Sequence, residues 1–200
     1  FVELGLVSCF SFLRGASDAV DLVSTARALG YDAIGIADAN SMAGIVRIHS
    51  EAKTLKLKPV IGCRIETVEG FSFLAYPTDR SAYGRVCRLI SAGRMRTLDG
   101  EWQEKGACDI SLTMLAEHCE DVRLILLPPR NLDAEFTIEI ESNVLPFPLP
   151  LAEGARGGSA SASSDAPTPA SSKREGSKLT ALFPDILPHL VEQLPTLRHL

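Results

Sequence analysis

Apolar and polar residues alternate along the first two thirds of the chain with two different periods. Short, mostly apolar runs predict buried strands, and longer segments with apolar residues every three or four positions predict helices. In the first of these helices, Ser17 is expected to be the N-cap and Gly30 to end the helix. The alternation favours an α/β fold with a largely parallel sheet. The strands are expected at residues 2–7, 33–37, 59–66, 71–76 and 122–127, and the helices at 18–29, 42–55, 79–94 and 111–118.

The pattern fails in the last third of the chain. Of the 27 residues from 152 to 178, 20 are Ala, Gly, Ser, Pro or Thr, and none has a large apolar side chain. Such a segment cannot bury enough apolar surface to offset the entropy lost on ordering, so it is expected to be a flexible linker or insertion. We therefore divide the chain into an α/β domain at residues 1–150, a low-complexity linker at 151–178, and a resumed, truncated region at 179–200.

Composition and charge narrow the class of protein. Hydrophobic residues make up 46% of the chain and charged residues 22%, as in ordinary globular proteins. No apolar run approaches the roughly 18 residues that cross a bilayer, and no leader peptide is visible, so we expect a cytoplasmic protein without membrane contact. The net charge of -5 argues against an electrostatic DNA clamp. The five cysteines form no CxxC pair, which gives no support for a zinc knuckle or a disulfide framework.

Four blocks of sequence, in order, carry a resemblance to a known family. The blocks are ELGLVSCFSFLRGAS at 3–17, GYDAIGIAD at 30–38 continuing to SMAG at 41–44, PVIGC at 59–63, and LAYP at 74–77 with YGRVCRL at 83–89. Together they resemble the PHP domain at the front of bacterial DNA polymerase III alpha subunits, and FSFLRGAS is most similar to the error-prone branch. The resemblance covers roughly residues 1–130. It implies an α/β fold that is the first part of a PHP-type β/α barrel, with its site at the carboxyl ends of the strands.

Active members of the family bind metal ions through His and carboxylate ligands, and the resemblance assigns five of those positions to this chain. Gly5 and Val7 stand where the family has a His-x-His pair, Asp38 and Ala39 where it has an Asp-His pair, and Arg64 where it has a Glu. Only Asp38 keeps a ligating side chain, and an arginine repels a cation. We therefore predict a degenerate site with no catalytic residue and no metal in this chain.

Two further interpretations concern side chains near the strand ends. Ser8 and Ser11 lack a G-x-S-x-G elbow or a paired His, so we do not interpret either as a nucleophile. Asp38 without a metal would be a costly lone carboxylate, and Arg64 could replace the lost positive charge by pairing with it. The alternative interpretations are an Arg64 that points to solvent and an Asp38 that ends a strand and caps a helix.

The resemblance implies a non-catalytic PHP portion of an error-prone DNA polymerase that acts in damage-induced mutagenesis and translesion DNA synthesis. Its partners would be the remaining polymerase domains, DNA through the full-length protein, and other mutagenesis proteins. Magnesium is implied for the full-length nucleotidyltransferase and no cofactor for this part of it. The alternative from another class is a stand-alone PHP-type metal-dependent phosphoesterase with ligands at other positions. A decayed fragment without function is the third interpretation.

Overall fold

The computed structural model describes residues 2–140 and 177–194. The described residues form two compact units, one of residues 2–136 with 181–194 and the other of residues 137–140 with 177–180. Within the described residues, none of the helices has both the length and the apolar character that crossing a membrane requires.

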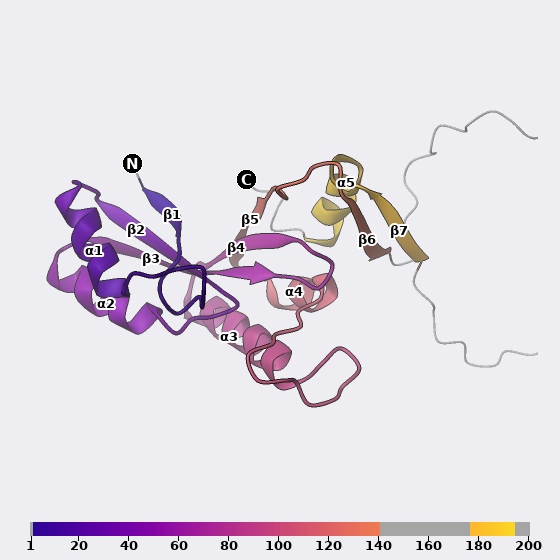
Figure 1. Cartoon of the computed structure of the whole chain (residues 1–200), viewed down its shortest axis with the longest axis horizontal. Coiled ribbons are helices and arrows are strands. Elements are labelled where there is room, and N and C mark those ends of the chain that lie inside the picture. Colours follow the sequence, from indigo (N-terminus) through magenta and orange to yellow (C-terminus); the bar gives the residue numbers. More distant parts are fainter. Residues whose placement is uncertain (1, 141–176, 195–200) are drawn as a thin grey trace, which may run out of the picture. The chain divides into compact units, whose positions relative to one another are not determined.

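A five-stranded sheet organises the first unit, with its strands side by side in chain order (Figure 1). The strands are β1 (Glu3–Leu6), β2 (Ala33–Ala39), β3 (Lys58–Glu66), β4 (Ser72–Pro77) and β5 (Val122–Leu127). The first three strands are mutually parallel, and β4 is antiparallel to both of its neighbours. The predicted strands are confirmed within two residues at each end, but the largely parallel sheet is wrong at β4. Only five residues connect β3 to β4, whereas a parallel crossover needs a dozen or more.

Four helices of this unit lie along one side of the sheet (Figure 1). Their bounds are α1 (Ala19–Ala28), α2 (Ile45–Thr54), α3 (Arg80–Met95) and α4 (Leu112–His118). The expected cap of α1 at Ser17 is wrong by one residue, because the carboxylate of Asp18 accepts the hydrogen bond from the backbone N–H of Val20 at 3.1 Å. Ser111 is the N-cap of α4, since its hydroxyl accepts from the N–H of Met114 at 3.2 Å.

The two faces of the sheet are buried to different degrees. Alternate residues of β2, such as Ile34 and Ile36, pack with Val23 of α1 and Ile48 of α2, and all four are fully buried. The opposite face also carries apolar side chains, but several of them are only partly covered, among them Leu4, Val60, Ile125 and Leu127. A curled sheet with one helix-covered face and one partly covered inner face is the first part of a barrel, as the sequence predicts.

The chain resumes its regular structure near its carboxyl end. A short two-stranded sheet joins β6 (Glu135–Ile140) to β7 (Ser177–Leu182), and α5 (Phe183–Gln193) follows. In the first unit, Phe183 lies beside Phe71 and Phe136, whose rings stack with centroids 4.9 Å apart. The sequence analysis missed β6, although its Phe136 and Ile138 alternate with polar residues as a strand requires.

The low-complexity linker expected at residues 151–178 lies almost entirely outside the described residues. Only its last two residues, Ser177 and Lys178, are described, and they form the start of β7. The expected flexibility of the remaining residues stays a prediction.

Burial sets the chemistry of the cysteines. Cys63 is fully buried in β3, and burial, followed by the neighbouring thiols and Asp38, raises the pKa of its thiol far above the ordinary value. Cys9 is exposed. Because only a thiolate alkylates readily, iodoacetamide at pH 8 should modify Cys9 quickly and leave Cys63 unmodified in the folded protein.

Peptide mapping by mass spectrometry measures both cysteine rates in one sample. In denaturant all five cysteines should react, which controls for the intrinsic reactivity of each sequence. Equal labelling of Cys63 and Cys9 in the folded state would show that β3 is not buried as described.

Candidate pocket at the carboxyl ends of the strands

Asp38 lies at the end of β2 and is almost fully buried, with 1% of its surface exposed. Three hydrogen bonds from the loop after β1 compensate the burial of its carboxylate. The backbone N–H of Ser8 donates to Oδ1 at 2.8 Å and its hydroxyl to Oδ2 at 2.7 Å, while the hydroxyl of Ser11 donates to Oδ1 at 2.7 Å. The Ser11 hydroxyl in turn accepts from the N–H of Ala39 at 2.9 Å, so the serines pin the loop to the end of β2.

Asp38 is not accompanied by further metal ligands within the described residues. Its oxygens already accept three hydrogen bonds. Gly5, Val7 and Ala39, which the resemblance assigns to other ligand positions, have no side-chain atom that could ligate a metal. Within residues 2–140 and 177–194, no group of three His, Cys, Asp or Glu side chains comes together as a candidate metal site. The residues present therefore do not fit the metal cluster that active members of the family would bind.

The expected ion pair between Arg64 and Asp38 is wrong. In the parallel pairing of β2 with β3, Asp38 is aligned with Cys63, and Ala39 is aligned with Arg64. Successive side chains of a strand point to opposite faces, so Asp38 faces the helices and Arg64 faces the inner side of the sheet. Hydrogen bonds from Ser8 and Ser11, and not a guanidinium, compensate the buried carboxylate.

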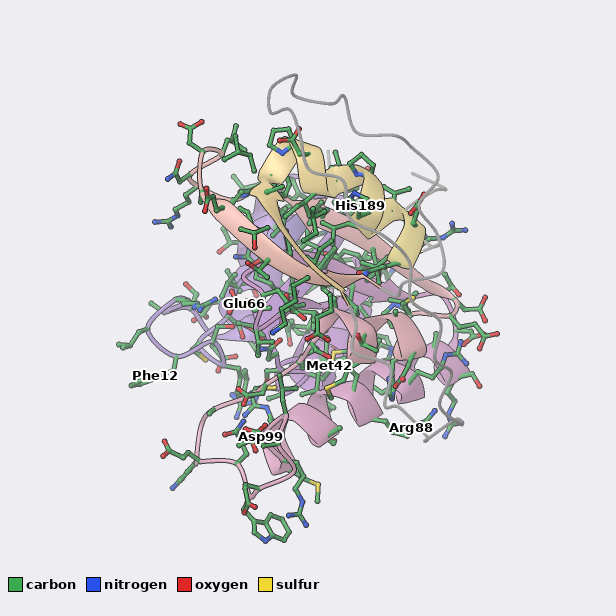
Figure 2. All side chains as sticks on the ribbon, turned by 90° about the vertical axis from the view of Figure 1, so that its right-hand side faces the viewer. Phe12, Met42, Glu66, Arg88, Asp99 and His189 are labelled. Carbon is green, nitrogen blue, oxygen red and sulfur yellow. The ribbon has the colours of Figure 1, made fainter. Side chains whose placement is uncertain are left out.

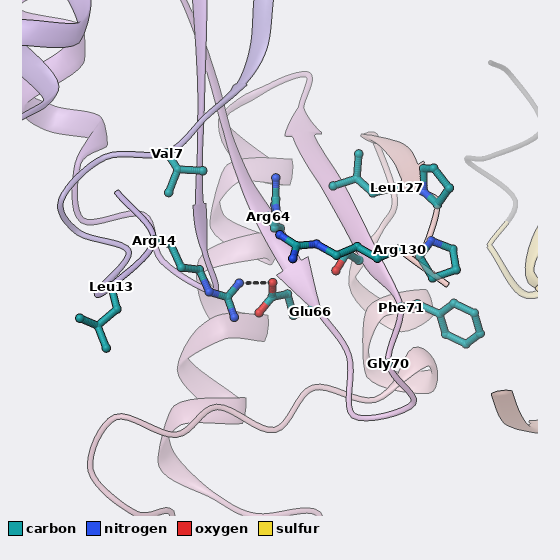
Figure 3. A pocket seen from close by; sticks show the side chains of 12 residues that line it. Val7, Leu13, Arg14, Arg64, Glu66, Gly70, Phe71, Leu127 and Arg130 are labelled. Carbon is teal, nitrogen blue, oxygen red and sulfur yellow. Dashed lines mark hydrogen bonds and ion pairs between the residues drawn. The ribbon is translucent and has the colours of Figure 1, made fainter. Parts of the chain in front are cut away.

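A pocket of about 810 Å³ opens on the inner side, at the carboxyl ends of β1, β3 and β5 (Figure 3). Arg64 and Glu66 of β3 line it, together with Arg14 from the loop after β1 and Arg130 from the segment after β5. Its apolar walls include Val7, Leu127, Pro128 and Pro129.

Three guanidinium groups face a single carboxylate in this pocket. Arg14 and Glu66 form an ion pair, which raises the pKa of the Arg14 guanidinium. The hydrogen bond to Glu66 is the larger cause, and the negative charge of Glu66 is the smaller one. Arg64 and Arg130 enter the same space, as Figure 3 shows. The Nε of Arg64 is buried and has no hydrogen-bond partner among the described residues. The arrangement can bind an anion, and within residues 2–140 and 177–194 no histidine or cysteine lines the pocket that could act as a base or nucleophile.

The structure brings only part of the predicted site together. Val7 and Arg64 line the pocket, whereas Gly5, Asp38 and Ala39 do not. The sequence analysis missed three charged residues that do line it, Arg14, Glu66 and Arg130. Each of them ends or follows a strand. The carboxyl ends of parallel strands meet at one edge of a sheet, so this position in the sequence could have indicated that the three residues lie near one another.

Comparison with known proteins gives consistent matches over the same residues. The PHP domain model matches residues 3–138. An error-prone DNA polymerase of Caulobacter vibrioides is 44% identical over 137 residues, which is 68% of this chain and 12% of that protein. An error-prone DNA polymerase of Allorhizobium ampelinum is 44% identical over 128 residues, 64% of this chain and 11% of that protein. The chain thus spans about a ninth of the length of these relatives, and the match covers their N-terminal part.

A solved structure from Bifidobacterium adolescentis, proposed to be a metal-dependent phosphoesterase, is also similar. It has a TM-score of 0.40 and 20% identity, covering 58% of this chain and 49% of that one. The fold assignment stands on the family match and on the strand order.

Proposed function

The chain belongs to the PHP domain family, and from this premise we propose that it is the N-terminal, non-catalytic PHP portion of an error-prone DNA polymerase. Sequence identity carries the proposal, and the residues of the strand-end site agree with it. Over the matched residues the chain is more than 40% identical to proteins named error-prone DNA polymerase, while its own strand-end site holds arginines where a metal site needs acidic or imidazole ligands.

In this proposal the whole protein is a DNA-directed nucleotidyltransferase that uses magnesium and deoxynucleoside triphosphates, and this portion adds no cofactor of its own. The whole protein acts in the cytoplasm in DNA repair and translesion synthesis after DNA damage. The remaining polymerase domains are the partners of the PHP portion. DNA is contacted through the full-length protein, and other mutagenesis proteins are further partners.

The stand-alone phosphoesterase is the weaker alternative. Hydrolysis of a phosphoester at neutral pH by this family's chemistry requires a metal to activate water and to neutralise charge. Asp38, the position that keeps a ligating side chain, is bound by Ser8 and Ser11, and Arg64, which is aligned with Ala39 on the neighbouring strand, occupies the inner face. An active site would need ligands from residues outside the described part of the chain.

Two assays run side by side test the proposal. The complete gene product that carries this chain should extend a primer with magnesium and deoxynucleoside triphosphates, and the 200-residue chain alone should not. Neither should hydrolyse p-nitrophenyl phosphate when manganese or zinc is added. Metal-dependent hydrolysis by the chain that persists through a second purification, or a complete gene product without primer extension, would overturn the proposal.

A further inference from the structure

We propose that the pocket at the carboxyl ends of β1, β3 and β5 binds an organic phosphate without a metal ion, through the guanidinium groups of Arg64 and Arg130. The site depends on the charges and walls of this pocket alone. It would exist whether or not the complete gene product polymerises DNA, so the two proposals can fail separately.

The charge of the pocket is the first reason. Arg14 and Glu66 neutralise each other as an ion pair, which leaves the two other arginines of the pocket. Neither of their guanidinium groups is in an ion pair with a described residue, although the chain as a whole carries a net charge of -5. Arg130 is exposed and Arg64 is partly buried, so water screens part of their repulsion, and an anion bound between them would remove the rest.

The hydrogen-bonding state of Arg64 is the second reason. Its Nε is buried without a partner in the described part of the chain, and a buried donor without an acceptor costs free energy. A guanidinium presents its donors in a planar fork that matches two oxygens of a phosphate. A phosphate between Arg64 and Arg130 would therefore supply the acceptors and the negative charge at once. Figure 3 shows both side chains entering the pocket beside Glu66.

The size and walls of the pocket indicate what the phosphate is attached to. A volume of about 810 Å³ lies in the range of small-molecule sites, and an inorganic phosphate would fill little of it. Val7, Leu127, Pro128 and Pro129 provide apolar surface near the arginines. This combination fits a phosphomonoester that carries an organic group about as large as a nucleoside.

The pocket is expected to bind this ligand and not to convert it. Of the residues that the structure describes, no histidine or cysteine lines it and Glu66 is the only carboxylate, which is held by Arg14. The expected signature is therefore binding that persists when metal ions are chelated. A metal-dependent PHP site would show the opposite behaviour.

Isothermal titration of the chain with deoxyadenosine monophosphate, in low salt with EDTA, tests the proposal. Saturable binding is expected, with deoxyadenosine and inorganic phosphate each binding roughly tenfold more weakly, because one lacks the charge and the other the organic group. Arg64→Gln and Arg130→Gln should each weaken binding by roughly tenfold, and Arg64→Lys should recover part of the loss. Arg88→Gln is the matched control, since Arg88 is an exposed arginine of α3 outside the pocket (Figure 2).

The outcomes separate cleanly. Absence of saturable binding by the folded chain would overturn the proposal, as would binding that needs a divalent metal. Binding that is unchanged in Arg130→Gln would also overturn it. Arg130 follows β5 and lies outside the sheet, so this variant decides the question even if Arg64→Gln fails to fold.

Discussion

Asp38→Ala is expected to lower the free energy of unfolding by about 3–5 kcal/mol. The substitution leaves the N–H of Ser8 and the hydroxyls of Ser8 and Ser11 buried without the acceptor that each now uses. It also releases the loop after β1 from the end of β2. Urea unfolding monitored by circular dichroism measures the change.

Two companion variants distinguish a hydrogen-bonding role from a metal-binding or ion-pairing one. Asp38→Asn keeps one carbonyl acceptor and the size of the side chain, so it should cost roughly 1–2 kcal/mol. Asp99→Ala removes an exposed carboxylate (Figure 2) and should stay within about 0.5 kcal/mol of the original chain. A cost below about 1 kcal/mol for Asp38→Ala would contradict the described network.

Gly62→Ala should destabilise the fold by about 3 kcal/mol, through overpacking on the inner face of the sheet. A Cβ at this position would lie 2.4 Å from Cε1 of the Tyr76 ring and 2.8 Å from the backbone oxygen of Ala75. Tyr76 cannot move away cheaply, because it is buried and its hydroxyl donates to the carbonyl of Leu4 in β1. Relieving the clash would therefore require β3, β4 and β1 to shift.

The control for this prediction is a glycine with room beside it. Gly84 lies in α3, and a Cβ there would meet nothing closer than a guanidinium nitrogen of Arg88 at 3.6 Å. Since alanine favours the helix over glycine, Gly84→Ala should raise stability by roughly 0.5–1 kcal/mol. Thermal and urea unfolding of both variants should therefore shift in opposite directions. Stability changes of the same sign would count against the described packing around Tyr76.

Local sequence patterns predicted much of the sheet and its helices. The strand Val122–Leu127 has the predicted bounds, because a short apolar run between turn residues has few alternatives. The direction of β4 was not predicted correctly, although the predicted strand bounds left only residues 67–70 to connect it to β3. Loop length fixes that direction through the reach of the chain, and hydrophobic periodicity contains no information about it.

The candidate site was harder to predict because its contacts join distant segments. The resemblance selected Asp38, but its partners Ser8 and Ser11 lie about 30 residues earlier in the chain. The predicted pair of Asp38 with Arg64 is wrong because successive side chains of a strand point to opposite faces. The register of β2 against β3 aligns Arg64 with Ala39 and so places Asp38 on the other face. The pocket depends on Arg130 and other side chains outside the strands, whose directions follow from the packed structure.

Equilibrium dialysis of the chain against manganese tests the central claim, which is a PHP fold without its metal site. Manganese prefers oxygen and imidazole ligands, so the free cysteines should not obscure the result. We expect no manganese retained in stoichiometric amount at micromolar free metal, while a PHP phosphoesterase with intact ligands retains it under the same conditions. Retention of one or more ions per chain, lost in Asp38→Asn while that variant stays folded, would contradict the account.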